Sequence, residues 1–286
     1  MSSSSYKPEI PPPPSDPAVL LSYPAPFVLL VTINRPRQMN SIPFAVHWHL
    51  HRVFEWFDQE PTLRVAVLTG AGPKAFCAGQ DLIELGKRDV KALEEKPYLG
   101  HHPPSGFGGI SRRVGKKPVI AAVNGFALGG GFEIVLNCDM VVASPTATFG
   151  LPETLRGIYA GAGGLPRLVR NVGLPLASEI SMSGRTLSAA EALQFHLINR
   201  VSSSSAPDAC VVDAVNLARK VADISPDAII VTRAALRETW ETASVERAYQ
   251  LVEDRYKKPL MDGENSREGL AAFAEKRKPV WKPSKL

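Results

Sequence analysis

The sequence lacks the long apolar segments that place a protein in or across a membrane. Its longest apolar runs, such as PVIAAV, fall far short of the ~20 residues that a membrane-spanning helix needs. The start, MSSSSYKPEIPPPP, contains neither the basic cluster nor the apolar segment of a secretory signal. Serine and proline bury too little apolar surface to offset the entropy of ordering, so we expect residues 1–17 to form a disordered tail.

Paired cysteines are also absent. The three cysteines, Cys77, Cys138 and Cys210, are far apart and form no CxxC pair. The sequence therefore argues against a zinc cluster and a disulfide framework, and three free thiols suit a reducing compartment. His47 and His51 would share one face of a helix, but no Glu-His pairing typical of zinc peptidases accompanies them, so we expect no metal site.

Composition and charge are those of a soluble globular protein with a basic end. Hydrophobic residues make up 44% of the chain and charged residues 21%, an ordinary balance that allows a large core. The net charge is +5, and basic residues crowd RYKK (255–258) and EKRKPVWKPSKL (275–286). This end is either a solvated surface or a site for a polyanionic ligand, such as nucleic acid or a phosphorylated cofactor.

The last three residues, Ser284, Lys285 and Leu286, spell SKL. At an extreme C-terminus this tripeptide is an address read by the peroxisomal import receptor. Lys282 and Pro283 precede it and are expected to keep the tail exposed. We therefore expect a peroxisomal protein of a eukaryote, with that receptor as a partner.

Strand and helix patterns alternate along the chain. FVLLVTINRP (27–36), RVAVLTG (64–70) and KPVIAAVNG (117–125) are apolar runs closed by turn residues, as is typical of strands. Residues 41–61 carry apolar side chains at three- and four-residue spacings and predict a helix. GFEIVLNCDMVVAS (131–144) predicts a helix that runs into a short strand. This alternation predicts an α/β fold.

The same patterns divide the chain into regions. We expect a core over residues 18–201, followed by the linker-like SSSSAPD. Long helical patterns predict a helical region for packing or oligomerisation over residues 202–282, before a tail at 283–286. Residues 87–109 contain the loop-like HHPPSGFGG, and we expect a mobile segment there beside any site.

Two glycine turns share one form, in which a strand end is followed by glycine and a helix start. They are KAFCAGQDLIEL (74–85), where Asp81 is placed to cap the helix, and GFALGGGFEI (125–134). Helix N-termini present unpaired N–H groups and the positive end of the helix dipole. Two such turns can direct two N–H donors at one oxygen and form an oxyanion hole, although the glycines also suit tight turns alone.

Two glutamates stand in apolar sequence near these turns. Glu133 follows the second glycine run, and Glu153 lies beside Pro152. A buried carboxylate has to be paired or to have its pKa raised. Either glutamate alone would also suit an ion pair or the surface, so these residues by themselves leave the function open.

The motifs resemble those of the crotonase (enoyl-CoA hydratase/isomerase) superfamily in order and spacing, over roughly residues 26–282. They are NRPRQMNSI, AFCAGQDL, KPVIAAVNGFALGGGFEI, CDMVVASPTATFGLPE, GAGGLPRL, SGRTLSAAEAL and EGLAAFAEKRKP. The resemblance implies a spiral of ββα repeats with a helical C-terminal region that assembles a homotrimer or a dimer of trimers.

The resemblance also implies a site. Family members bind acyl-CoA thioesters, so coenzyme A is part of the substrate and no separate cofactor is expected. The backbone N–H groups of the family's oxyanion hole fall on Gln80 and Gly130. The two glutamates that flank the double bond in hydratases match Glu133, as base for the water, and Glu153, as proton donor to Cα. The residues expected to contact coenzyme A or the substrate are Arg37, Lys276 and Lys278, for the phosphates, and Cys77, Ala78 and Asp81 at the first turn.

Enoyl-CoA hydratase, a hydro-lyase, is the favoured function because isomerases of the superfamily generally keep only one of these carboxylates. The alternatives are an enoyl-CoA isomerase, a hydratase-like lyase, and a fungal peroxisomal branch that converts mevalonyl-CoA to anhydromevalonyl-CoA for siderophores. General fatty-acid oxidation is the default role. From other classes, an RNA-binding relative would use the basic surface, and a scaffold would carry a degenerate site. Neither of these needs Glu133 and Glu153, so we expect no nucleic-acid partner.

Three positions call for separate interpretation. Ala160 replaces a proline of the family's loop after Glu153, next to Tyr159, so we expect a reshaped acyl pocket. His196 stands where relatives often have a helix-terminal glycine in a left-handed conformation, and we expect it to be structural. Asp139 is expected to serve as a cap or a subunit contact rather than in catalysis.

Overall fold

A computed structural model describes residues 6–87, 100–242 and 244–286, and its main sheet has six strands. In spatial order these are β1 (Val19–Ala25), β2 (Val28–Ile33), β3 (Val65–Gly70), β5 (Val119–Val123), β7 (Met140–Ala143) and β10 (Arg200–Val201). β1 pairs antiparallel with β2, and the later neighbours pair in parallel. The sequence analysis did not predict β1, which turns into β2 at Phe27, where φ is 64°.

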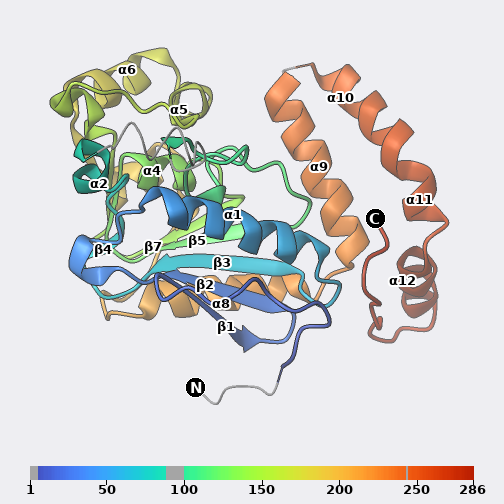
Figure 1. Ribbon diagram of the computed structural model, residues 1–286. Coiled ribbons are helices and arrows are strands. Elements are labelled where there is room, and N and C mark those ends of the chain that lie inside the picture. Colours follow the sequence, from blue (N-terminus) through green and yellow to red (C-terminus); the bar gives the residue numbers. More distant parts are fainter. Residues whose placement is uncertain (1–5, 88–99, 243) are drawn as a thin grey trace.

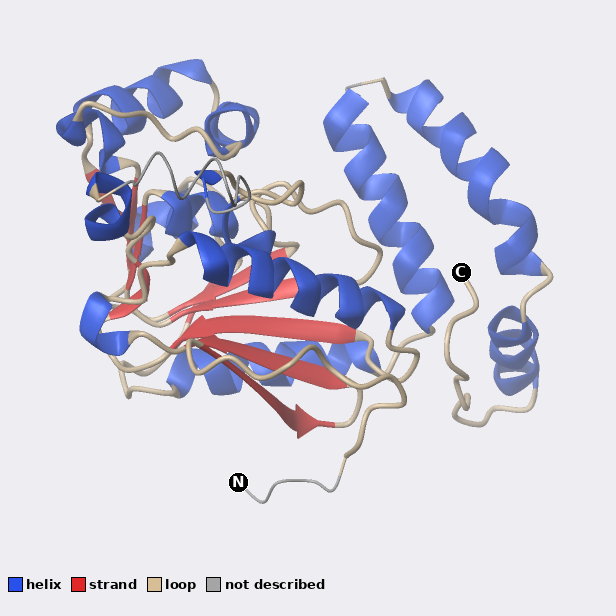
Figure 2. Ribbon diagram, viewed as in Figure 1, coloured by secondary structure: helices blue, strands red, loops and turns tan. Residues whose placement is uncertain are grey.

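A second, smaller sheet lies near one end of the main sheet (Figure 2). Its order is β4 (Ala75–Cys77), β6 (Phe126–Leu128), β8 (Thr148–Gly150) and β9 (Thr186–Ser188). The two glycine turns of the sequence follow β4 and β6, which are parallel neighbours. Parallel neighbours end at the same edge of a sheet, so both turns emerge side by side.

Two helices cover opposite faces of the main sheet, α1 (Phe44–Gln59) and α8 (Ala209–Ala222) (Figure 1). Successive side chains of a strand point to opposite faces, so Val65 and Val67 pack in the cluster under α8 while Leu68 packs in the cluster under α1. Every residue of β3 is buried, which explains why its sequence is apolar from Val65 to Leu68.

The other helices of this part of the chain surround the strand ends. α2 (Leu82–Gly86) follows β4, and α4 (Gly130–Val135) follows β6. The remaining helical elements of this part are the 3-10 turns η1 (Pro36–Gln38), η3 (Phe107–Gly109) and η4 (Pro152–Arg156) and the helices α5 (Gly164–Val172), α6 (Leu174–Ser183) and α7 (Ala189–Gln194). Within the described ranges, no helix is both long and apolar enough to span a bilayer.

The C-terminal helices extend to one side of the sheets, with α9 beside the core (Figure 1). They are α9 (Pro226–Thr242), α10 (Val245–Val252), the π-helical turn η5 (Glu253–Lys257), α11 (Lys258–Met261) and α12 (Glu264–Ala274). This differs from the expected division at residue 202, because α8 forms part of the main sheet's layers.

The N-terminal segment also differs from its prediction as a disordered tail. The backbone N–H of Ile10 donates to Glu60 at 2.7 Å, and its carbonyl accepts from the Trp56 indole at 2.8 Å. The hydroxyl of Tyr6 bonds to Thr62. The described part of this segment is therefore attached to the end of α1, while residues 1–5 lie outside the described residues.

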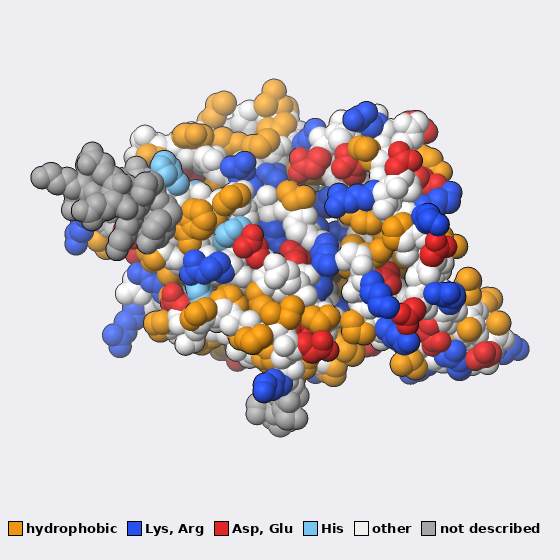
Figure 3. All heavy atoms as spheres, turned by 45° about the vertical axis from the view of Figure 1, so that its right-hand side comes forward, with side chains coloured by type: hydrophobic (Ala, Val, Ile, Leu, Met, Phe, Trp, Pro, Cys, Tyr) orange, Lys and Arg blue, Asp and Glu red, His pale blue; other side chains and the backbone are white. Residues whose placement is uncertain are grey.

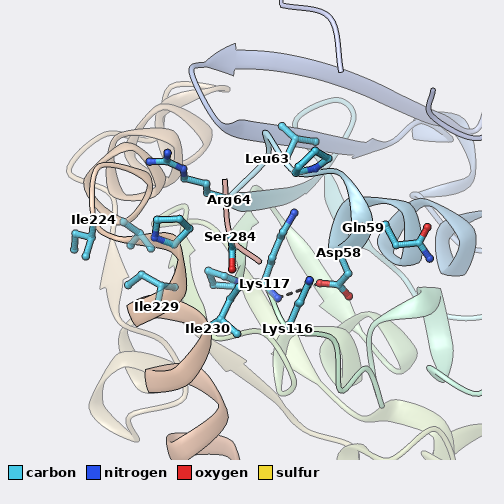
Figure 4. Close-up of a pocket in the computed structure, with 14 residues that line it drawn as sticks. Asp58, Gln59, Leu63, Arg64, Lys116, Lys117, Ile224, Ile229, Ile230 and Ser284 are labelled. Carbon is cyan, nitrogen blue, oxygen red and sulfur yellow. Dashed lines mark hydrogen bonds between the residues drawn. The ribbon is translucent and has the colours of Figure 1, made fainter. Parts of the chain in front are cut away.

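The C-terminal tail is exposed in part. Lys282, Pro283 and Lys285 are exposed, whereas Ser284 and Leu286 are partly buried. Ser284 bonds to Asp227, and the backbone carbonyl oxygen of Leu286 accepts from Lys116 Nζ at 2.6 Å. Ser284 also lines a pocket beside Ile230 and the two lysines that precede β5 (Figure 4). The expectation of an exposed tail therefore holds for Lys285, while polar contacts hold the residues on either side of it.

One carboxylate joins the C-terminal helices to the main sheet. Asp139, just before β7, accepts from the backbone N–H of Val119 at 2.9 Å. Arg233 and Arg237 of α9 lie 3.0 and 2.9 Å from its Oδ1. Burial raises the pKa of Asp139, but the two guanidinium groups outweigh burial and hold the pKa below its ordinary value. Asp139 therefore anchors α9 within the chain.

Replacing Asp139 by alanine is expected to lower the free energy of unfolding by about 3–5 kcal/mol, because the buried Arg233 and the half-buried Arg237 lose their partner. Since its pKa is depressed in the folded state, the stabilisation is present above the unfolded value of 3.8 and is lost as the pH falls below it. Urea unfolding near neutral and at acidic pH measures both effects. The control is Asp262→Ala, which breaks an exposed ion pair with Lys258. Equal free energies of unfolding for Asp139→Ala and this control would contradict the role of Asp139 as an anchor for α9.

Candidate active site

One cavity brings together both glycine turns and both glutamates. Its walls come from the turns before α2 and α4, from η4 and the loop after it, and from residues 100–107. Five of the residues predicted for the site line it: Ala78, Gln80, Gly130, Glu133 and Glu153. Residues that are far apart in the sequence thus meet, because the parallel neighbours β4, β6 and β8 end at one edge of the small sheet.

The backbone N–H groups of Gln80 and Gly130 are placed to share one acceptor. Ile42 pairs with Gln80 by donating to Gly79 at 2.9 Å and accepting from Asp81 at 3.2 Å, so the N–H of Gln80 points to the other side of the chain. Gly130 is the first residue of α4, where the N–H has no intrahelical partner. A Cβ at Gly79 would lie 3.4 Å from the nitrogen of Gly130, so the turns touch. Among the described residues, neither N–H donates a hydrogen bond.

Glu133 is buried, and backbone N–H groups hold its carboxylate. Its Oε1 accepts from Ala162 at 2.9 Å and from Gly164 at 2.8 Å. Burial raises the pKa of Glu133, while these two donors and the charge of Arg167 oppose the rise. A Cβ at Gly164 would lie 2.5 Å from Cγ of Glu133, so only glycine permits this approach.

Glu153 is held by fewer donors. It lies in the first turn of η4, and its Oε2 is buried without a hydrogen-bond partner in the described structure. Burial, together with the charge of Glu133, raises the pKa of Glu153 to about 7, while a hydrogen bond with its own backbone opposes the rise. A Cβ at Gly129 would lie 2.7 Å from its Oε1, so a glycine again admits the carboxyl group.

The two environments make a complementary pair. Donors favour the ionised form of Glu133, whereas Glu153 keeps its proton to near neutral pH. Titratable groups whose surroundings separate their pKa values are suited to act as base and acid. With two N–H donors in the same cavity for a developing oxyanion, the arrangement can add or remove a proton beside a carbonyl.

Sequence reasoning missed the polar cluster around the Gln80 side chain. Gln80 Oε1 lies 2.9 Å from His47 Nε2 and 3.2 Å from His102 Nε2. His102 lines the cavity, and His47 is fully buried on α1. The sequence analysis considered His47 only as a metal ligand, and no periodic signal links residues so far apart. No group of three or more potential metal ligands occurs in the described part of the chain.

Several predicted residues do not line the cavity. Arg37 is exposed on η1, and Lys276 and Lys278 are exposed after α12, on the opposite side of the molecule from α2 (Figure 1). Asp81 stands between two lining residues but caps α2 and pairs with Arg35 at 3.0 Å. Contact of these four residues with coenzyme A stays a prediction.

Cys77 is fully buried behind the first turn, and burial raises the pKa of its thiol to about 12. A thiol with that pKa stays protonated at neutral pH, which agrees with the absence of a base in the sequence around it. Arg156 lines the cavity and is exposed, a basic residue that the sequence analysis did not single out.

Tyr159 and His196 lie as the sequence predicts, whereas Ala160 does not line the cavity. Tyr159 lines the cavity and is 73% exposed, and Ala160 is buried next to it. His196 has a φ of 58°, the left-handed conformation expected there. Of the predicted mobile segment 87–109, residues 88–99 lie outside the described residues, and Gly100, His101, His102 and Phe107 line the cavity.

Comparisons with known proteins agree over almost the whole chain. Residues 26–284 match the family model described as enoyl-CoA hydratase/isomerase. The chain is 47% identical to mevalonyl-coenzyme A hydratase sidH of Aspergillus fumigatus, over 93% of this chain and 96% of that protein. It is 38% identical to carnitinyl-CoA dehydratase of Proteus mirabilis, over 89% of this chain and 95% of that protein. The crystal structure of an enoyl-CoA hydratase from Bacillus anthracis superposes with a TM-score of 0.83 at 33% identity, covering 93% and 100% of the chains.

In the ligand-free protein, the carboxyl group of Glu153 is expected to titrate at about 7. Replacing Glu133 by glutamine removes a neighbouring negative charge and should lower this pKa. Carboxyl-carbon chemical shifts from glutamate-labelled protein measure both values. A Glu153 that titrates in the ordinary range of exposed glutamates, or that does not respond to Glu133→Gln, would contradict the proposed environment.

Proposed function

Since the chain belongs to the enoyl-CoA hydratase/isomerase family, we propose that it interconverts mevalonyl-CoA and anhydromevalonyl-CoA by removing or adding water. The crotonase-like fold and the hydratase activity predicted from the sequence are confirmed by its relatives, and the chain is a hydro-lyase acting on acyl-CoA. The observation that carries the proposal is the pair of unlike carboxyl groups facing one cavity. The 47% identity to a mevalonyl-CoA hydratase supports this acyl group, which would serve siderophore biosynthesis.

In the dehydration direction, ionised Glu153 takes the proton from Cα, and protonated Glu133 gives a proton to the departing β-hydroxyl. The electrons of the Cα–H bond form the double bond as water leaves. Negative charge on the thioester oxygen is stabilised by the N–H groups of Gln80 and Gly130. Hydration is the reverse, with Glu133 as base for water. Each acid–base contact is worth ~10²–10⁴-fold in rate and one oxyanion donor ~10²–10³-fold.

An isomerase needs to move one proton between two carbons, which a single carboxyl group can do. The second carboxylate, Glu133, is held at the cavity by two backbone donors and would have no role in that reaction. The structure therefore favours hydration. Fatty-acid oxidation would use the same chemistry on an unbranched acyl group, and substrate preference separates the two roles.

The basic C-terminal end does not favour a nucleic-acid partner. Arg277 pairs with Glu268 at 2.6 Å, and Lys282 pairs with Glu264 at 2.6 Å. On the face drawn in Figure 3, basic and acidic side chains are interspersed over the C-terminal helices. Binding of a polyanion is favoured by an uninterrupted basic surface.

The same helices support a homotrimer or a dimer of trimers. They expose large apolar side chains that a neighbouring subunit would cover: Leu236, Val245, Tyr249, Leu270, Phe273 and Val280. Exposed apolar surface of this extent marks an interaction site. A neighbouring subunit is also the route by which Lys276 and Lys278 would reach coenzyme A. Sedimentation velocity should give a trimer or hexamer mass, and a monomer would contradict the assembly.

The C-terminal SKL supports peroxisomal import, for which the receptor has to displace the contacts of Ser284 and Leu286. A full chain tagged with a fluorescent protein at its N-terminus is expected in peroxisomes. Deletion of residues 284–286 should move it to the cytosol. Cytosolic fluorescence of the full chain would overturn the assignment.

Glu133→Gln and Glu153→Gln are each expected to lower turnover by about 10²–10⁴-fold, because each removes one acid–base group while keeping the shape of the side chain. The absorbance of the conjugated thioester follows the reaction with anhydromevalonyl-CoA and with crotonyl-CoA. Glu55→Gln, at an exposed position of α1, is the matched control and should retain wild-type activity. Full activity of either cavity variant would refute its role, and preference for crotonyl-CoA would favour fatty-acid oxidation.

A further inference from the structure

The side-chain amide of Gln80 has a fixed orientation, which follows from the histidine behind it. The backbone N–H of Gly108 donates to His47 Nδ1 at 2.9 Å, so this ring nitrogen carries a lone pair. Burial lowers the pKa of His47 to about 3, with the neighbouring His102 adding to the effect, so the ring is neutral. Its single proton is therefore on Nε2, which lies 2.9 Å from Gln80 Oε1.

Because His47 Nε2 is a donor, the atom of Gln80 that faces it must be the carbonyl oxygen. The ring of His47 packs against Phe107, with centroids 4.4 Å apart, and this contact keeps the ring in place. His102 Nε2 lies 3.2 Å from the same oxygen. The amide nitrogen of Gln80 consequently points away from the histidines with both of its N–H groups.

That amide nitrogen is shielded from solvent and has no hydrogen-bond partner in the described structure. Buried amide donors in proteins are nearly always satisfied, and an exception beside a cavity indicates a missing partner. Gln80 lines the cavity together with Phe44, Leu82 and Phe107, whose side chains offer no acceptor. The partner that fits is an oxygen of the acyl group.

We propose that the side-chain amide of Gln80 binds a hydroxyl group on the acyl chain that the reaction leaves in place. The inference rests on the proposed function, because the backbone N–H of the same residue is assigned to the thioester oxygen. A mevalonyl group carries two hydroxyls. The β-hydroxyl leaves as water between the two glutamates, and the terminal hydroxyl remains to meet the amide.

Charge and lone pairs exclude two other acyl ends. A quaternary ammonium, such as a carnitinyl group carries, has no lone pair to accept from an amide. An acyl chain that ends in a carboxylate would bring a further negative charge beside the Glu133 and Glu153 pair, while His47 next to Gln80 is neutral. A neutral hydroxyl accepts the hydrogen bond without either penalty.

Titration calorimetry with two unreactive ligands tests the assignment. Pentanoyl-CoA and its freshly prepared analogue with a terminal hydroxyl both lack a double bond and a β-hydroxyl, so neither can react. Wild-type protein is expected to bind the hydroxylated ligand about 10- to 100-fold more tightly, because the other ligand leaves a buried donor unpaired. Gln80→Met keeps the length of the side chain and the backbone N–H, but its side chain has no donor. The ratio of the dissociation constants of the two ligands should therefore fall close to one. Gln194→Met, exposed on α7, is the control and should keep the wild-type ratio.

A wild-type ratio near one would overturn the inference, as would a Gln80→Met protein that keeps the preference. If Gln80→Met does not fold, Gln80→Leu, which also has neither a donor nor an acceptor on its side chain, should lose the preference as well. The calorimetry does not depend on turnover. Wild-type protein that lacks the preference but shows Glu133-dependent turnover would overturn this inference alone, whereas wild-type protein that shows the preference without turnover would overturn only the proposed dehydration.

Discussion

The site depends on one unequal arrangement, in which two carboxyl groups share an apolar cavity and the backbone donors of Ala162 and Gly164 hold only Glu133. Two backbone N–H groups hold Glu133, while Glu153 has a buried oxygen without a partner. Two neighbouring carboxylates resist simultaneous ionisation, and the donors on Glu133 favour placing a shared proton on Glu153. That placement is the form that hydration requires, and dehydration proceeds from the form in which Glu133 holds the proton.

Glycine makes this arrangement possible. Gly129 faces Glu153 and Gly164 faces Glu133, in each case at a distance that a Cβ would occupy. A Cβ at Gly130 would lie 2.6 Å from the ring of Phe107, so the third glycine lets an aromatic wall pack on the oxyanion turn. The glycine runs thus do more than turn the chain, since they let backbone donors and carboxyl groups approach closely enough to act on the same few atoms.

Much of this could be predicted from the sequence, and the exceptions have physical causes. Local periodicity identified α1 and β3, and the ordered motifs identified both glycine turns and both glutamates. Tertiary contacts decided the rest: the tail residue Ile10 is ordered by Glu60, and the terminal tripeptide by Lys116. The role of His47 in orienting Gln80 depends on a hydrogen bond from Gly108, sixty-one positions away, which no local pattern announces.

The central claim is that catalysis requires the carboxyl pair to hold one shared proton, and the pH dependence of kcat/KM tests it most directly. Hydration and dehydration exchange no net proton with solvent, so the account predicts the same bell-shaped profile in both directions. Its alkaline limb should lie at about 7, where Glu153 loses its proton, and should be missing from the residual activity of Glu153→Gln. An alkaline limb that persists unchanged in Glu153→Gln would contradict the account.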